Sequence, residues 1–317
     1  MEKNQKIRVL VTGGSGLLAG RINEFLKDKE INCKLLSRFS KIKKIKSSDI
    51  VFTDWKFNSL KKKVKDYDVV IHCAGLNANE CQNDPKLANK INYLNSRKIL
   101  DISIKNKVKL FIFISTVHVY KSPLLGKFDE YTNTINNHPY ALTKRKFEKY
   151  LIKKSSGSKL KGLVVRLSNS FGKPVNKLSN CWGLLVNDLC KNLHKTNTII
   201  LQSPKNSVRD FIPITSLNMF LYDIIKKILI DKIKINYSIV NFASGKSQTI
   251  FSLAKNISLV FKNISSKKAI IQKKFSNIQN KEICKISSKR INFKSYQNKK
   301  IFDNEISNLL IFCKKNF

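Results

Sequence analysis

The chain has 317 residues, of which 42% are hydrophobic, and its seven cysteines are scattered. A chain of this size can bury a large core as one domain or as two, and no stretch approaches the roughly 20 apolar residues of a membrane span. The odd number of cysteines and the lack of any C-x-x-C pair disfavour a disulfide framework and a metal site. Because residues 1–8 also lack the features of a secretory signal, we expect a reduced, cytoplasmic protein.

The formal net charge is +40, from 61 basic and 21 acidic residues. Two interpretations stay open: a basic patch that binds nucleic acid or a membrane surface, or a composition in which lysine covers ordinary helix surfaces. The basic residues are not gathered in one tail or on one helix, which favours the second interpretation. We therefore expect no nucleic-acid partner and no membrane partner, although such a surface would attract an anionic nucleotide substrate.

Short apolar runs alternate with amphipathic segments through the first half of the chain. The expected strands are Ile7–Thr12, Asn32–Ser37, Ile50–Thr53, Val69–Ala74, Val108–Ser115 and Leu163–Leu167. The expected helices are Leu17–Lys29, Pro85–Lys105 and Tyr140–Lys153. Strands that are apolar throughout and separated by helices indicate a parallel sheet covered on both faces. The predicted fold class is therefore α/β, with a Rossmann-type doubly wound parallel sheet.

After about residue 170 this alternation loosens, and glycine and proline separate shorter elements. We expect residues 1–170 to form a dinucleotide-binding domain and residues 171–317 a smaller mixed α/β lobe that completes a cleft. Part of 205–245 is expected to return to the large sheet. The Lys-rich stretch 267–300 carries little structure signal and is expected to be partly mobile, and Asn304–Cys313 is predicted to be a closing helix.

A glycine-rich turn, TGGSGLLAG at residues 12–20, follows the first strand and opens the first helix. Gly13 permits the tight turn, Gly16 lets the backbone approach a pyrophosphate, and Ala19 allows the helix to pack on the strand. The N–H groups and the positive dipole end of the helix would face the phosphates. A plain strand-to-helix turn is the alternative. The other residues of the turn expected to contact a dinucleotide are Ser15, Leu17 and Leu18.

The end of the second strand bears on which dinucleotide is bound. An acidic residue there would bind the ribose hydroxyls of NAD, but the sequence has Ser37 and Arg38. Arg38 can hold the 2′-phosphate of NADP through charge-assisted hydrogen bonds, so NADP is somewhat favoured over NAD; a solvated surface arginine is the alternative. Asp54 and Trp55, after the third strand, are expected near the adenine.

Three residues with reactive or orienting side chains follow the fifth strand. Tyr140 and Lys144 are four residues apart in a helical segment, so they share one face. Thr116 ends the fifth strand, at the edge where open α/β sheets bind ligands. A phenol near an ammonium can act as general acid or base, and the threonine hydroxyl can orient the reacting oxygen. Taken singly, strand-end capping and a surface helix start explain these residues equally well.

Several motifs, in this order, resemble those of the extended short-chain dehydrogenases/reductases, the NAD-dependent epimerase/dehydratase family. They are TGGSGLLAG (12–20), VVIHCAG (69–75), INYLNSRKIL (91–100), STVHVY (115–120), YALTK (140–144), VVRLSNSFG (164–172), VRDFIPI (208–214) and NFASGKSQTI (241–250). The resemblance implies Thr116, Tyr140 and Lys144 as the catalytic residues, with Lys144 also on the cofactor. It places Cys73, Ala74, Gly75 and Asn92 beside the cofactor, and Asn169 and Arg209 on the diphosphate of a nucleotide-sugar substrate. Homodimers are common in the family.

Departures from the family pattern narrow the reaction. Val117 and His118 stand where family 4,6-dehydratases carry an Asp-Glu pair, which disfavours elimination, and His118 becomes a candidate to contact substrate. Ser37 and Arg38 stand where 4-epimerases that retain NAD carry an Asp. We expect a nucleotide-sugar epimerase or a 4-keto-sugar reductase. A non-catalytic NADP-binding sensor and, less favoured, a nucleic-acid-binding protein are the alternatives; the sugar and the nucleotide stay open.

Overall fold

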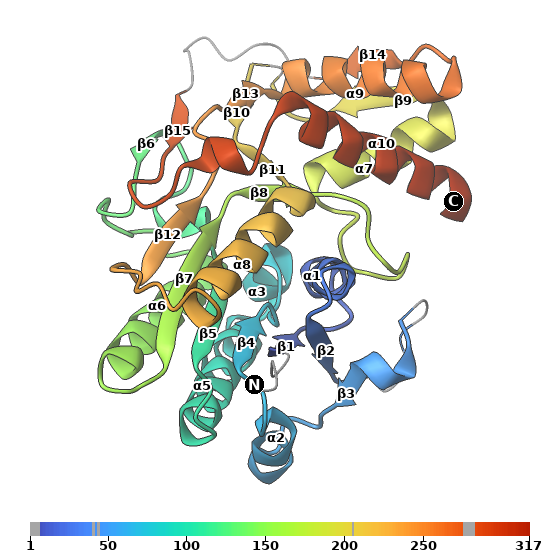
Figure 1. Ribbon diagram of the computed structural model, residues 1–317. Coiled ribbons are helices and arrows are strands. Elements are labelled where there is room, and N and C mark those ends of the chain that lie inside the picture. Colours follow the sequence, from blue (N-terminus) through green and yellow to red (C-terminus); the bar gives the residue numbers. More distant parts are fainter. Residues whose placement is uncertain (1–6, 40–41, 43–44, 205, 275–282) are drawn as a thin grey trace.

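The computed structural model describes residues 7–317 except 40–41, 43–44, 205 and 275–282 (Figure 1). Its centre is a sheet of seven parallel strands in the order β12-β7-β5-β4-β1-β2-β3. They are β1 (Arg8–Thr12), β2 (Asn32–Ser37), β3 (Ile50–Phe52), β4 (Val69–His72), β5 (Leu110–Thr116), β7 (Lys161–Leu167) and β12 (Ile239–Phe242). The strand order reverses between β1 and β4, which is where doubly wound sheets bind ligands. The predicted fold class is confirmed.

Helices cover both faces of this sheet because successive side chains of each strand point to opposite faces. Val9 and Val11 of β1 pack with α1 (Leu17–Asp28) and α8 (Ile214–Leu229) on one face. Leu10 belongs to the core on the other face. The helices on that side are α2 (Phe57–Val64), α5 (Asn95–Lys105) and α6 (Pro139–Ser156).

The smaller lobe has a hydrophobic core of its own. Its helices are α7 (Leu185–Thr196), α9 (Ile250–Ser265) and α10 (Lys299–Asn316). Four two-stranded sheets pair β8 (Asn169–Phe171) with β11 (Phe211–Pro213), β9 (Thr198–Leu201) with β14 (Ile270–Lys273), β10 (Val208–Arg209) with β13 (Gln248–Thr249), and β6 (Gly126–Phe128) with β15 (Cys284–Ile286). Strand β12 lies beside β7 in the large sheet. The domain boundary near residue 170 stays a prediction.

A buried ion pair joins the first helix of the sheet to the last helix of the chain. Arg21 Nη1 lies 2.6 Å from Glu305 Oε1, and the amides of Lys173 and Thr215 also donate to this carboxylate (3.3 and 3.2 Å). Arg21 holds the pKa of Glu305 below its usual value although burial opposes this. A side chain on Gly172 would come within 2.4 Å of Glu305 Oε1. The carboxylate therefore fixes α10 against both α1 and the loop after β8.

Two segments differ from the sequence-based expectation. The helix expected at Pro85–Lys105 is α4 (Pro85–Ala88), one π-helical segment (Asn89–Leu94) and α5. The stretch 267–300 contains β14 and β15 in its described part, and residues 275–282 lie outside the described residues. Within the described ranges, no helix is long and apolar enough to cross a membrane, and no three potential metal ligands come together.

Candidate active site

The glycine turn presents bare backbone at the carboxyl end of β1. Gly13 has φ +82°, and a side chain there would come within 3.0 Å of the Ala74 nitrogen. The Gly16 N–H donates to Gly13 O at 2.8 Å and closes the turn. No side chain caps the first turn of α1, so its N–H groups stay available to an anion. The turn fits a pyrophosphate approached by backbone alone.

The other turn residues reach a ligand through backbone more than through side chains. Ser15 is exposed, and its carbonyl accepts a hydrogen bond from Ser179 Oγ at 3.1 Å. Leu17 is buried against Cys181, and Leu18 is half-buried at the edge of the sheet core. Leu17 and Leu18 can therefore offer N–H groups of the first helical turn but not free side chains.

The ends of β2 and β3 flank this turn. Ser37 is buried beside Gly14, where an added side chain would come within 3.1 Å of Ser37 Cβ. Arg38 is exposed next to it. Asp54 is exposed and accepts the Lys56 N–H at 3.0 Å, which lowers the pKa of its carboxyl. Trp55 has φ +61° and packs at the edge of the core below.

A chain of four polar groups fixes the segment after β4. The backbone N–H groups of residues 73 and 74 donate to Thr12 Oγ1 (3.2 and 3.1 Å). The hydroxyl proton of Thr12 then points at His72 Nδ1, 2.7 Å away. Because Nδ1 accepts this proton, the other ring nitrogen, His72 Nε2, carries the ring proton and donates to Ser96 Oγ at 2.7 Å. Ser96 Oγ donates to Asn92 O at 2.8 Å. Burial lowers the pKa of His72 to about 3, so the ring is neutral and serves as a structural link.

Asn92 anchors the next loop from within the π-helical segment. Its Oδ1 accepts the Leu76 N–H at 2.7 Å, and its Nδ2 donates to Cys81 Sγ at 3.2 Å. An added side chain on Gly75 would come within 3.0 Å of Asn92 Oδ1 and 3.7 Å of Lys144 Nζ. Asn92 thus holds the loop after β4 directly beside the amine of Lys144.

Thr116, Tyr140 and Lys144 meet at the carboxyl end of β5, and we call them the catalytic floor. Thr116 lies close enough to the Tyr140 phenol to lower its pKa, against the larger, raising effect of burial. Lys144 Nζ donates to Ile114 O at 3.1 Å and lies 5.8 Å from the centre of the Tyr140 ring. Helix α6 begins just before the tyrosine, where His138 Nδ1 accepts the Tyr140 N–H at 3.2 Å.

Burial sets the protonation of the catalytic floor. It lowers the pKa of Lys144 to about 8, and the neighbouring thiols of Cys73 and Cys81 partly oppose this. Burial, with a contribution from Cys81, raises the pKa of Tyr140 to about 12, while Thr116 lowers it. In the protein alone, desolvation of the phenolate therefore dominates the pKa of Tyr140.

A buried ion pair lies beneath the catalytic floor. Glu148, one turn after Lys144, accepts hydrogen bonds from Ser115 Oγ and from Arg166 Nη2, the latter at 2.7 Å. Arg166 Nη1 donates to Tyr120 Oη at 3.1 Å, and that hydroxyl donates to Asn241 Oδ1 at 2.7 Å. The network ties α6 to β5, β7 and β12, so the helix carrying Tyr140 and Lys144 is fixed from below.

His118, Asn169 and Arg209 lie near one another beside the catalytic floor, and we call them the polar wall. Burial lowers the pKa of the His118 imidazole and Arg209 adds to this, while Asn169 acts in the opposite direction. Asn169 Nδ2 donates to Asp210 O at 2.9 Å, and Arg209 Nη1 donates to Val208 O at 3.0 Å. The His118 N–H donates to Thr116 Oγ1 at 3.2 Å, which joins the wall to the floor.

Glu148 and Arg166 were not among the residues predicted from the sequence, and no site role was predicted for Cys81. The signal for Glu148 was present, since 140, 144 and 148 are spaced four apart on one helix face. Nothing in the sequence placed Cys81 against Asn92 or near Tyr140, because that contact joins separate helical segments.

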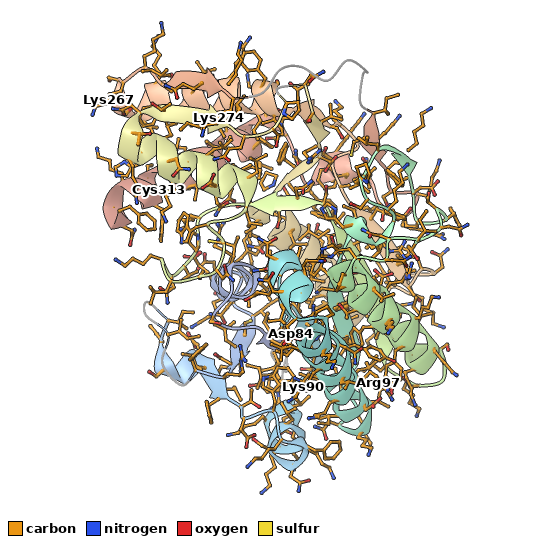
Figure 2. All side chains as sticks on the ribbon, turned by 180° about the vertical axis from the view of Figure 1, so that it is seen from behind. Asp84, Lys90, Arg97, Lys267, Lys274 and Cys313 are labelled. Atoms are coloured by element: carbon orange, nitrogen blue, oxygen red, sulfur yellow. The ribbon has the colours of Figure 1, made fainter. Side chains whose placement is uncertain are left out.

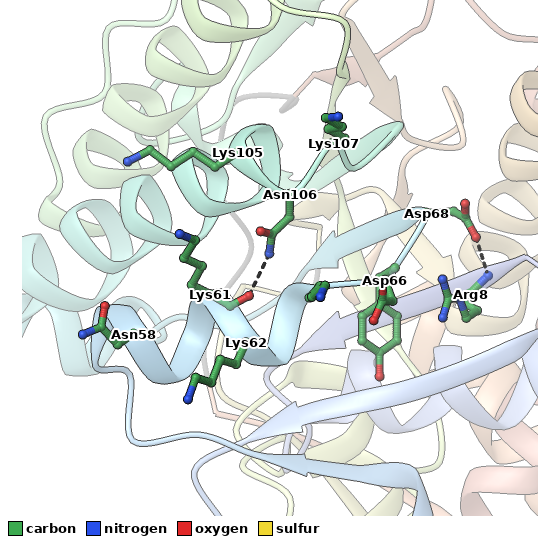
Figure 3. Close-up of a pocket in the computed structure, with 11 residues that line it drawn as sticks. Arg8, Asn58, Lys61, Lys62, Asp66, Asp68, Lys105, Asn106 and Lys107 are labelled. Carbon is green, nitrogen blue, oxygen red and sulfur yellow. Dashed lines mark hydrogen bonds between the residues drawn. The ribbon is translucent and has the colours of Figure 1, made fainter.

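A second depression lies at the opposite, amino end of the sheet. It is a hollow of about 770 Å³ bordered by the ends of α2 and α5, and Figure 3 shows Lys61 and Asn106 on its rim. Asp68, also on its rim, accepts the Arg8 N–H at 3.0 Å and pairs with Lys109 at 2.9 Å. None of the predicted site residues lines it, so it is separate from the cleft described above.

A doubly wound sheet, a bare glycine turn on β1 and a Thr–Tyr–Lys group at the end of β5 define a Rossmann-type enzyme built around a dinucleotide. The chain belongs to the NAD dependent epimerase/dehydratase family, whose sequence model matches residues 9–222. The expected membership in the extended short-chain dehydrogenases/reductases is confirmed.

Three known proteins show the range of this similarity. An ADP-L-glycero-D-manno-heptose-6-epimerase of Brachyspira hyodysenteriae is 26% identical over 271 residues, 81% of this chain and 82% of its own. A dTDP-D-glucose 4,6-dehydratase of Dictyostelium discoideum is 25% identical over 220 residues, 60% of this chain and 50% of its own. A UDP-N-acetylglucosamine 4-epimerase of Methanobrevibacter ruminantium, solved with UDP-N-acetylmuramic acid, has 22% identity and a TM-score of 0.80 over 99% of this chain and all (100%) of its own.

Proposed function

We propose that the protein is an NAD(P)-dependent enzyme that transfers hydride at a sugar carbon of a nucleoside-diphosphate sugar, as an epimerase or a 4-keto-sugar reductase. The observation that carries this proposal is the catalytic floor, where Thr116 lies beside the Tyr140 phenol and buried Lys144 follows one turn further on, with its Nζ 5.8 Å from the centre of the Tyr140 ring. The two matched epimerases support epimerisation, and Ser37-Arg38 in place of an acidic residue supports reduction with NADPH.

The residues around the glycine turn fit a dinucleotide. The pyrophosphate would lie on the uncapped N-terminus of α1, in the space that a side chain on Gly13 or Gly16 would narrow. Arg38 is exposed at the end of β2, where a 2′-phosphate would lie. The segment 73–75, Asn92 and Lys144 would border the nicotinamide half. When bound, the dinucleotide supplies or accepts the hydride.

Tyr140 would move the proton at the reacting sugar oxygen. In reduction its hydroxyl donates a proton to the carbonyl oxygen, and in oxidation the phenolate accepts the hydroxyl proton. Thr116 would hydrogen-bond the same oxygen and orient it. Because burial raises the pKa of Tyr140 to about 12, the phenol is held protonated in the free protein, the form that a reductase needs at the start.

The polar wall would hold the substrate during this transfer. Arg209 is charged and Asn169 is fixed through Asp210, so the two would bind the diphosphate, and His118 would contact the sugar or the phosphate nearest to it.

Outward residues of the helices before Tyr140 support a homodimer, since Leu87 and Leu94 are 40% and 45% exposed there. The seven free cysteines support a reducing compartment such as the cytoplasm.

Incubating the purified chain with a panel of nucleotide sugars and keto-sugars, with NADPH, NADH or NAD⁺, tests the proposal. A sugar isomer formed without net cofactor consumption identifies an epimerase, and stoichiometric NADPH oxidation with a keto-sugar identifies a reductase. Tyr140→Phe should abolish either signal. Cofactor binding without turnover of any sugar, together with full biological function of Tyr140→Phe, would instead support the sensor.

A further inference from the structure

The outward face of α9 carries cations and apolar side chains at helical spacing. Phe251, Lys255, Leu259 and Lys262 recur every three or four residues and therefore share one face of the helix. Lys255 and Lys262 are exposed, and Leu259 is 53% exposed. Lys273 of β14 joins them, because its Nζ lies 5.2 Å from the centre of the Phe251 ring, while Lys255 Nζ lies 4.8 Å from it. We call these five residues the α9 face.

This part of the chain is almost without acidic residues. Between Asp231 and Asp303 the sequence has 16 basic residues and one acidic residue, Glu282, which lies outside the described residues. Within the described ranges no salt bridge pairs a lysine of the α9 face with a carboxylate. Asp303 of α10 contacts α9 only at its flank, through Asn256 Nδ2 (2.9 Å). The charge of the face is therefore not neutralised by neighbouring side chains.

A second basic surface, at the amino end of the sheet, has carboxylates close to its lysines. At the amino end of the sheet, Lys61, Lys62 and Lys65 lie with Asp66 and Asp68 around one hollow. Lys61 and Lys62 are also in the last turn of α2, where cations are stabilised by the helix dipole. In the α9 face only Lys262 is in the last turn of its helix; Lys255 lies in the second turn, so the dipole does not explain its position.

The apolar members of the α9 face indicate what kind of anion it fits. Leu259 stands at the middle of the exposed stripe and offers no ring on which a nucleic-acid base could stack. The one ring of the face, that of Phe251, is half-buried against the core of the smaller lobe and has Lys255 and Lys273 beside it. The ammonium groups of this face are complementary to anionic lipid headgroups, and its leucine is complementary to the apolar layer just below them. Figure 2 shows Lys267 and Lys274, which flank this region in sequence, projecting along the same end of the smaller lobe.

We propose that the α9 face docks on a surface of anionic lipids, with Lys255, Lys262 and Lys273 at the headgroups and Leu259 at the acyl boundary. Binding through one helix face is reversible and sensitive to salt. The proposal takes up the membrane-surface interpretation of the net charge, which the even spread of lysine had disfavoured. It does not depend on the proposed enzymatic function, because none of these residues belongs to the cleft.

Co-sedimentation of the full chain with lipid vesicles tests the proposal. We expect binding to vesicles of phosphatidylcholine mixed with phosphatidylglycerol, little binding to phosphatidylcholine alone, and release by salt. Replacing Lys255, Lys262 and Lys273 together by Gln should lower the partition coefficient on the order of 100-fold, at about fivefold per lysine. Leu259→Ser should lower it several-fold further at constant charge, since an exposed leucine gains by entering the acyl boundary.

A triple substitution of Lys61, Lys62 and Lys65 to Gln is the matched control, because it removes the same charge from the other basic surface. It should leave vesicle binding unchanged. Equal losses from the two triple variants would overturn the proposal, as would no binding to the anionic vesicles. Loss of binding to a homopolymer RNA with unchanged vesicle binding would assign the face to nucleic acid instead. Thermal unfolding and sugar turnover in solution, measured for each variant, show that the fold is intact.

Discussion

The catalytic floor stands on β5 and α6, whereas the polar wall comes from β8, β10 and the turn after β5. The floor is fixed from below by the buried Glu148–Arg166 pair and by the chain from Thr12 to Asn92. Asn169 and Arg209 of the wall each have a hydrogen bond to a neighbouring carbonyl, at 2.9 and 3.0 Å. The residues that would move a proton are thus held by a buried network, whereas the residues that would hold the substrate are held by single hydrogen bonds.

Tyr140→Phe is expected to have the largest effect. It removes the proton donor and leaves the ring, so turnover should fall by roughly 10²–10⁴-fold, the usual share of general acid–base catalysis. KM for the nucleotide sugar should change little, because the wall is untouched. Steady-state kinetics measure both values. The exposed Tyr131, changed in the same way, is the control and should keep full activity.

Glu148→Gln and Glu305→Gln compare the two buried ion pairs. Each substitution removes the buried countercharge of a buried arginine, although Arg21 keeps the half-exposed Glu24 at 3.4 Å. Each should destabilise the fold by about 3–5 kcal/mol, measured by urea unfolding. Only Glu148→Gln should also lower turnover under conditions where the protein stays folded, because only Glu148 lies beneath the floor. Equal turnover losses in the two variants would show that the network under Tyr140 has no particular role.

Arg209→Gln tests the wall. A neutral amide replaces the charged donor to the diphosphate, so KM should rise about 10–100-fold, the range expected for a hydrogen bond to a charged group. Turnover at saturating substrate should stay close to that of the parent chain. A fall in turnover with unchanged KM would contradict the division between floor and wall.

The pH dependence of cofactor binding should give the smallest effect. Burial lowers the pKa of Lys144 from 10.5 to about 8, so its ammonium is complete below pH 8 and is lost as the pH rises through that value. The amine is a weaker donor by about 1 kcal/mol, and affinity for the reduced dinucleotide should fall roughly fivefold above pH 8. Tryptophan fluorescence titrations at several pH values measure this fall in dinucleotide affinity. The Lys144→Met variant should not show it.

The sequence was sufficient for the main architecture because its signals were local. Continuous apolar runs predicted the six strands from β1 to β7 that the large sheet takes from the first half of the chain, to within a few residues. Membership in the family followed from motifs that each occupy a few consecutive positions. The roles predicted for the site residues stay predictions, although the structure brings Thr116, Tyr140 and Lys144 together.

What the sequence did not indicate arises from contacts between distant segments. A π-helical segment at Asn89–Leu94 leaves the apolar periodicity almost unchanged, so the pattern predicted one uninterrupted helix. Strands β14 and β15 have three or four residues each and pair with β9 and β6, far away in the chain. The raised pKa of Tyr140 reflects how deeply α6 is packed, which spacing alone does not encode.

The contact of Arg21 with Glu305 spans 284 positions of the chain. During synthesis the glycine turn emerges among the first residues, yet the buried partner of Arg21, Glu305, is among the last residues to emerge. Until α10 emerges, Arg21 has only the half-exposed carboxylate of Glu24 on its own helix (3.4 Å) and lacks the buried carboxylate of Glu305. Maturation of the pyrophosphate cradle is thereby coupled to completion of the polypeptide.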